Sequence, residues 1–126
     1  MPLVRIALRR GKPAAHLAAL RDGVYHAMRD TFDVPEHDRF ILVSQHDADE
    51  FDGDPGYLGI ARSDDLVIVQ ITCASGRSTA QKQALYRRIA DNLAAAPGLR
   101  PQDVFINLVE TSRENWSFGN GIAQYV

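Results

Sequence analysis

The sequence predicts an α/β fold of the α+β kind, with two tandem βαβ units that share one four-stranded sheet and place both helices on one face. Three observations predict it. The chain has 126 residues, 45% of them hydrophobic, which is typical of one globular domain. Its two halves match in pattern at an offset of 65 residues. Each half contains an apolar run, then a pattern typical of an amphipathic helix, and then a second apolar run. We therefore expect a single domain over residues 1–126, with repeat units at about 2–62 and 67–126.

Residues that match at this offset share size and polarity. The matched pairs include Val4 and Val69, Ile6 and Ile71, Gly11 and Gly76, Leu20 and Leu85, Asp38 and Asp103, and Phe40 and Phe105. Because the matches are spread along most of each half, we interpret them as a duplication. It predicts a pseudo-twofold axis that relates the two units.

The elements of the first unit follow from local patterns. Residues 2–8 form a short apolar run and are predicted as a strand. Over 12–32, apolar residues recur mostly at spacings of three and four, which predicts an amphipathic helix. Its apolar positions are Leu17, Leu20, Val24, Ala27 and Met28. Pro35 ends this helix, because the residue before a proline avoids the helical region, and residues 40–44 are predicted as the next strand.

The second unit repeats this order. Residues 66–73 are predicted as a buried strand. Ser78 and Gln81 offer a capping box at the start of a helix. The core face of that helix is predicted to be Leu85, Ile89 and Leu93. The dipeptide 97–98, Pro-Gly, stops the helix, and residues 104–109 are predicted as the last strand.

A strand–helix–strand unit joins parallel neighbours through a right-handed crossover, so both helices cover the same face of the sheet. The other face also carries apolar groups. Only residues 47–62 and 111–126 remain to cover it, and neither segment is large enough. We therefore expect a closed, symmetric oligomer that buries this face.

Composition restricts the function classes. The formal net charge is −2, which favours neither nucleic acid nor an anionic membrane as a partner. No apolar run approaches the ~20 residues of a membrane span, and Arg5, Arg9 and Arg10 interrupt any apolar core of a secretory signal. The single cysteine, Cys73, fits a reducing compartment. We expect a cytoplasmic protein that binds neither nucleic acid nor membrane.

Three residues carry candidate chemistry. Once Met1 is removed, Pro2 presents a secondary amine, which can move a proton or form an iminium with an aldehyde. Arg77 stands at the start of the second predicted helix, where an anion is favoured, although an arginine at such a position is more often a solvated surface charge. Asp38 can set the charge state of the amine or simply end a turn, and its repeat mate Asp103 supports the turn.

Other constellations point to no further chemistry. Trp116 and Phe118 alternate on one face and can serve as core, interface or pocket wall. The four histidines lack metal-ligand spacing, so no metal site is predicted.

Several stretches together resemble the tautomerase superfamily, and specifically its malonate semialdehyde decarboxylases. Pro2 and the tandem βαβ duplication belong to this pattern. The more specific stretches are Val34-Pro35 with Asp38-Arg39, Val43-Ser44-Gln45-His46, Arg77-Ser78 with Gln81-Lys82, and Trp116-Ser117-Phe118-Gly119. The resemblance extends over nearly the whole chain.

The resemblance implies a homotrimer with the amino-terminal proline in a pocket near a subunit boundary. It implies that Pro2 pairs with Asp38 and that two arginines, separated by one residue, hold the substrate carboxylate. The second arginine matches Arg77, whereas the first position is Ser75. A hydroxyl cannot supply the bidentate contact of a guanidinium, so decarboxylation is expected to be slower than in relatives with both arginines, and Ser75→Arg is expected to raise it.

The resemblance and the residues together predict a proline-dependent enzyme for a small oxo-carboxylate, without metal or organic cofactor. Pro2, Asp38 and Arg77 would act in catalysis, Arg77 and Ser75 would contact the carboxylate, and Trp116 with Phe118 would wall the pocket. The alternatives are a keto–enol tautomerase of the phenylpyruvate type and a hydratase of unsaturated acids. An alternative from another class is a non-catalytic trimeric binding protein that retains Met1, because an acylated Pro2 nitrogen has no basic lone pair.

Overall fold

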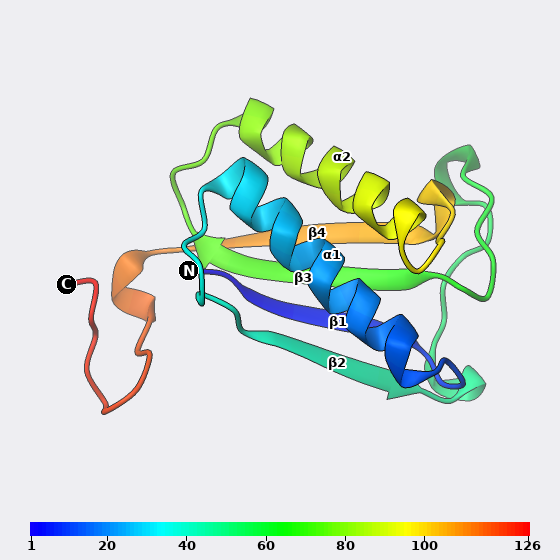
Figure 1. Ribbon diagram of the computed structural model, residues 1–126, viewed down its shortest axis with the longest axis horizontal. Helices are drawn as coiled ribbons and strands as arrows, with labels where there is room; N and C mark the ends of the chain where they lie inside the picture. The colour runs from blue at the N-terminus through cyan, green and yellow to red at the C-terminus, as the bar shows by residue number, and fades with distance from the viewer.

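The computed structural model, which describes residues 1–126, contains four strands and two long helices in the order that the sequence predicts (Figure 1). The elements are β1 (Leu3–Arg9), α1 (Ala14–Phe32), β2 (Ile41–His46), β3 (Val67–Ala74), α2 (Thr79–Ala95) and β4 (Val104–Thr111). Both helices lie on the same face of one sheet, which confirms the predicted fold class.

The sheet has the strand order β2-β1-β3-β4, with parallel outer pairs and an antiparallel central pair. Val4 pairs with Ile41 in the first unit, and its repeat mate Val69 pairs with Ile106, the mate of Ile41, in the second. In the central pair, Arg5 lies opposite its own repeat mate, Gln70. The register therefore has the symmetry of the 65-residue offset, and the pseudo-twofold axis passes between β1 and β3.

The helix ends follow local chemistry. Helix α1 ends at Phe32, because Asp33 adopts a left-handed conformation with φ of 53° while its N–H donates to the carbonyl of Met28. Helix α2 begins after Ser78, whose hydroxyl accepts from the N–H of Gln81 while the Gln81 side chain reaches back to Ser78. This is the predicted capping box.

The hydrophobic core fills the space between the helices and one face of the sheet. Its fully buried members come from β1, β3, α1 and α2 and include Val4, Ile6, Val69, Ile71, Leu20, Val24, Met28, Leu85, Ile89 and Leu93. The helices approach closely at Gly23, where an added Cβ would lie 2.7 Å from Cδ2 of Leu93. Asn92 donates to the carbonyl of Gly23 at 2.9 Å and holds this crossing.

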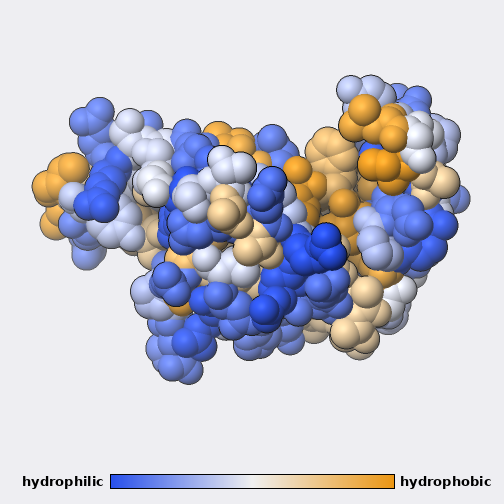
Figure 2. Space-filling view, turned by 90° about the horizontal axis from the view of Figure 1, so that it is seen from above, coloured by the Kyte–Doolittle hydropathy of each residue, from blue (hydrophilic) through white to orange (hydrophobic).

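The opposite face of the sheet is open, as the sequence predicts. Phe40, Leu42 and Phe105 on this side are 52%, 51% and 44% exposed. The two segments that end the repeat units lie at opposite ends of the sheet, the β2–β3 connection at one end and the C-terminal segment at the other (Figure 1). In Figure 2 the surface is hollowed between its two ends, with hydrophobic groups in the hollow and at both ends. Neither long helix combines the length and apolar character that a membrane crossing requires.

Candidate active site

The amino terminus lies against a buried carboxylate at one end of the sheet. Pro2 is buried and leads directly into β1. The Met1 amino nitrogen is 3.9 Å from Oδ2 of Asp38, whose side chain is only 6% exposed. Neither carboxylate oxygen of Asp38 has a hydrogen-bond partner. A buried, unpartnered carboxylate is costly, and the nearby amine is the group that it faces.

Asp103, the repeat mate of Asp38, has the opposite environment. It accepts from the N–H and the hydroxyl of Ser63, both at 2.7 Å, and from Nε of Arg100 at 3.2 Å. At the repeat offset, Pro35 stands in place of Arg100 and carries no side-chain donor, and no residue of the first unit corresponds to Ser63. The same position is therefore a satisfied structural carboxylate in the second unit and an unsatisfied one in the first.

The two groups of the amino-terminal pair shift each other's titration. Burial lowers the pKa of the Met1 amino group, with Asp38 opposing that effect and Arg77 adding to it. Burial raises the pKa of the Asp38 carboxyl, and the positive charges of the amino terminus and Arg77 oppose it. Both shifts favour the uncharged forms. Arg77 is close enough to act on both groups.

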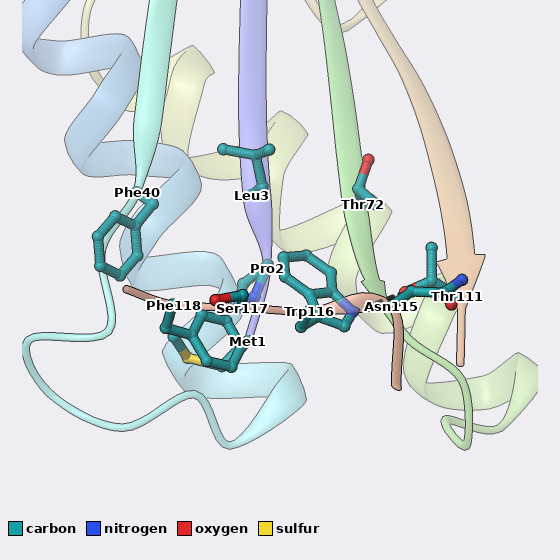
Figure 3. Close-up of a pocket in the computed structure, with 10 residues that line it drawn as sticks. All are labelled: Met1, Pro2, Leu3, Phe40, Thr72, Thr111, Asn115, Trp116, Ser117 and Phe118. Carbon is teal, nitrogen blue, oxygen red and sulfur yellow. Dashed lines mark hydrogen bonds between the residues drawn. The ribbon is translucent and has the colours of Figure 1, made fainter. Parts of the chain in front are cut away.

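Pro2 lines a cavity of about 450 Å³ whose wall includes Trp116 and Phe118 (Figure 3). The segment that carries these two aromatic residues crosses the ends of β1 and β3 beside Pro2 and Met1. Their rings stack with centroids 5.6 Å apart. Nε1 of Trp116 donates to Oγ1 of Thr111 at 2.7 Å, which fixes the indole against the end of β4. The aromatic wall gives the Pro2 cavity a largely apolar lining.

Arg77 lines a second cavity, of about 490 Å³, together with Ser75 and Arg113. Its two Nη atoms donate to the carbonyls of Ala74 at 3.2 Å and Phe32 at 3.3 Å. The guanidinium also lies 4.7 Å from the ring centroid of Phe32. These contacts orient the Arg77 side chain without a carboxylate partner.

Met1 connects the two cavities, because it lines both of them. The structure thus brings Pro2, Trp116 and Phe118 to one cavity, and Arg77 and Ser75 to the adjoining one. Asp38 faces the amino terminus and lines neither cavity.

No sequence pattern pointed to three other residues of this region. Thr111 positions Trp116, Arg113 lines the Arg77 cavity, and Tyr125 packs edge-on against Phe118 with centroids 4.9 Å apart. Their roles depend on the path of the C-terminal segment, which no local pattern predicts.

One group of carboxylates has the spacing of a metal site, although it lies away from both cavities. Asp47, Asp49 and Glu50 are exposed, with ligand atoms within 4.8 Å of one another. Asp47 already accepts from Nε of Arg10 at 2.9 Å, and Glu50 accepts from the N–H of Asp47 at 2.9 Å. These contacts account for the cluster as the cap of a short turn.

Comparison with known proteins agrees with the fold. Residues 38–119 match a family model described as "Tautomerase enzyme". The chain is 41% identical over 126 residues to the probable tautomerase YusQ of Bacillus subtilis (strain 168), covering 100% of this chain and 99% of that protein. A solved malonate semialdehyde decarboxylase, described with decarboxylase and hydratase activities, superposes with a TM-score of 0.92 at 36% identity, over 98% of this chain and 95% of that one. A fused 4-OT symmetric trimer shares the fold, with a TM-score of 0.78 at 20% identity over 95% and 94% of the chains.

The fold and the amino-terminal site define a tautomerase-superfamily enzyme. The family match and the full-length relative show that the chain belongs to the tautomerase family, and it is structurally similar to malonate semialdehyde decarboxylase.

Proposed function

We propose that this protein is a proline-dependent enzyme that acts on a small oxo-carboxylate, with malonate semialdehyde decarboxylation as the nearest reaction. The observation that carries the proposal is the buried carboxylate of Asp38, which has no hydrogen-bond partner and faces the amino terminus at 3.9 Å. A lone carboxylate beside a buried amine costs stability, and a function in proton transfer explains why the site keeps it. Removal of Met1 transfers the free amine to Pro2, at the edge of the aromatic cavity.

The groups present account for each step of a decarboxylation. The Pro2 nitrogen attacks the aldehyde carbon and forms an iminium as water leaves. The bond between the α-carbon and the carboxylate then breaks, its electron pair moves into the iminium, and carbon dioxide departs. The resulting enamine takes up a proton, and water releases the aldehyde product and the free amine. Asp38 sets the charge state of Pro2 or activates that water, while Arg77 holds the carboxylate.

The directions of the pKa shifts support a nucleophilic or basic amine. Burial and Arg77 both lower the pKa of the Met1 amino group and outweigh the opposing effect of Asp38. We expect the Pro2 amine that processing exposes to experience the same influences. Trp116 and Phe118 line the Pro2 cavity, and the apolar surface that they add favours the neutral form of the amine. A cytoplasmic location fits the proposal, since the single cysteine, Cys73, is free and buried.

A keto–enol tautomerase of the phenylpyruvate type is the second candidate, and a hydratase of unsaturated acids is the third. A neutral Pro2 amine can remove a proton from carbon and return it to oxygen, and the aromatic wall suits an arylated substrate. The full-length relative is named a probable tautomerase, which favours this candidate over the hydratase. Ser75 in place of an arginine favours the tautomerase further. Proton transfer between carbon and oxygen depends less than decarboxylation on two arginines that hold the substrate carboxylate.

A non-catalytic binding protein is the candidate from another class. With Met1 in place, the Pro2 nitrogen is an amide without a basic lone pair, and the free amine belongs to Met1. The processing state of the natural protein therefore decides between enzyme and binding protein.

We also propose that three copies assemble as a homotrimer through the open sheet face. Phe40, Leu42 and Phe105 expose apolar surface there, and Figure 2 shows the hollow between the two ends that a neighbouring copy would fill. The fused 4-OT protein of the same fold is named as a trimer.

The decisive experiment combines mass spectrometry with turnover. The mass of the purified protein reports whether Met1 is absent. The processed protein is then assayed on malonate semialdehyde, phenylpyruvate and an unsaturated acid. We expect Pro2→Ala to lower turnover of the preferred substrate about 100-fold or more, because a positioned acid or base contributes 10²–10⁴. Full activity of processed Pro2→Ala contradicts the proposal.

A further inference from the structure

We propose that Arg113 is the second carboxylate-binding residue of this site and supplies the guanidinium that position 75 lacks. This inference rests on the proposed function and makes its substrate class more specific: a short oxo acid whose carboxylate bridges Arg77 and Arg113. The carboxylate would then be held by one arginine that follows β3 and one that follows β4. The pattern that the resemblance implies instead has two arginines, at positions 75 and 77, that both follow β3.

The geometry of the Arg77 cavity carries this inference. Arg77 reaches the cavity from the turn between β3 and α2, and Arg113 reaches it from the short turn Arg113–Asn115 that follows β4. Ser75 and Gly76 line the same cavity between them. A volume of about 490 Å³ is ample for a three- or four-carbon acid.

Both guanidinium groups are free to bind an anion. Neither Arg77 nor Arg113 forms an ion pair within the chain, although eight ion pairs occupy other charged groups. Arg77 uses two of its five N–H groups on main-chain carbonyls, and Arg113 makes no side-chain hydrogen bond. The only acidic residue that lines the cavity is Asp33, which is exposed. The N-terminus of α2 adds a further positive contribution beside Arg77.

The cavity adjoins the position where the reacting amine would stand. Met1 lines both this cavity and the Pro2 cavity, so its removal joins the two. Tyr125 lines the arginine cavity and packs against Phe118, which lines the Pro2 cavity, so the aromatic residues form a common wall. A short oxo acid whose carboxylate lies on the arginines would extend toward Pro2 through the space that Met1 occupies, since Met1 lines both cavities.

The test compares variants at positions 113 and 75 in the processed protein. Malonate is the probe for binding, measured by titration calorimetry, because it carries the carboxylate and does not turn over. We expect Arg113→Ala to weaken malonate binding and raise KM for the oxo acid by about 10- to 100-fold, the effect of one lost charged hydrogen-bonding partner. Arg113→Lys should recover part of the loss, since it keeps the charge without the planar fork. Arg87→Ala, which removes an exposed arginine of α2 outside the cavity, is the matched control and should change neither quantity.

Ser75→Arg provides the rescue. In the Arg113→Ala background it should restore most of the malonate affinity, whereas in the wild type it should add less. Malonate binding by Arg113→Ala within twofold of the wild type, or no malonate binding by the wild type, overturns the inference. Malonate binding that depends on Arg113 in a wild type without turnover supports this inference and contradicts the proposed enzymatic function. An unchanged thermal unfolding midpoint of Arg113→Ala excludes misfolding as the cause.

Discussion

Replacing the two aspartates at equivalent repeat positions by asparagine should change stability in opposite directions. Asp38 and Asp103 are buried to a similar degree, with side chains 6% and 1% exposed. Asp103 accepts three hydrogen bonds, from Ser63 and Arg100, whereas Asp38 accepts none. Each variant is therefore the matched control of the other.

The magnitudes follow from these contacts. Asp103→Asn presents an amide N–H₂ to a site that holds only donors, and it loses at least one charge-assisted bond, which costs about 2–4 kcal/mol. Asp38→Asn removes a buried charge that lacks donors but loses its attraction to the amino group 3.9 Å away. Because the net shift raises the pKa of Asp38, burial outweighs that attraction. We expect Asp38→Asn to stabilise the fold by about 1 kcal/mol at pH 7, or roughly 3–5 °C in Tm.

The pH dependence has opposite signs at the two sites. The folded pKa of Asp38 is raised, so the wild type loses stability as pH rises from the ordinary aspartate pKa to the raised pKa of the folded state. The advantage of Asp38→Asn should therefore vanish below about pH 4 and be complete at neutral pH. Burial opposes ionisation of Asp103, but hydrogen bonds from Ser63 and Arg100 outweigh it and lower its pKa. The deficit of Asp103→Asn should therefore be full at neutral pH and shrink as pH falls through the lowered pKa.

Urea unfolding between pH 3.5 and pH 8, at one fixed protein concentration, measures both differences. A fixed concentration is needed because assembly adds to apparent stability. Destabilisation of similar size by both substitutions at neutral pH would refute the reasoning, since it would mean that Asp38 is as well satisfied as Asp103. Loss of turnover in the stabilised Asp38→Asn protein would indicate that the protein keeps the unsatisfied carboxylate for its function.

Two further predictions concern assembly and packing. If the open sheet face is a subunit interface, light scattering of the wild type should give three times the mass of the chain. Leu42 is 51% exposed in the single chain, and Leu42→Glu should lower the measured mass because it places a charge in the interface. A wild-type monomer at working concentration would contradict this prediction. Gly23→Ala should destabilise by about 1–3 kcal/mol in urea unfolding, because its Cβ would lie 2.7 Å from the buried Leu93; a stabilised variant would show that the helices separate readily.

The sequence by itself determined the elements and their order. The spacing of apolar residues predicts α1 and α2, and the Ser78–Gln81 capping box gives the start of α2 to the residue. The 65-residue offset predicts that a pseudo-twofold axis relates the two units. In the structure, Arg5 pairs with Gln70, the residue 65 positions later, as that symmetry requires. These features are local or repeated, so a single sequence contains them.

The tertiary structure alone decided how equivalent residues differ and which distant residues meet. Asp38 and Asp103 share one position in the repeat, yet only Asp103 receives donors, because Ser63 and Arg100 have no counterpart near Asp38. Arg113 joins Arg77 because the C-terminal segment turns back across the strand ends after β4. No sequence periodicity predicts the donors around Asp103 or the meeting of Arg113 with Arg77. Each depends on the position that a segment distant in sequence takes once the core has packed.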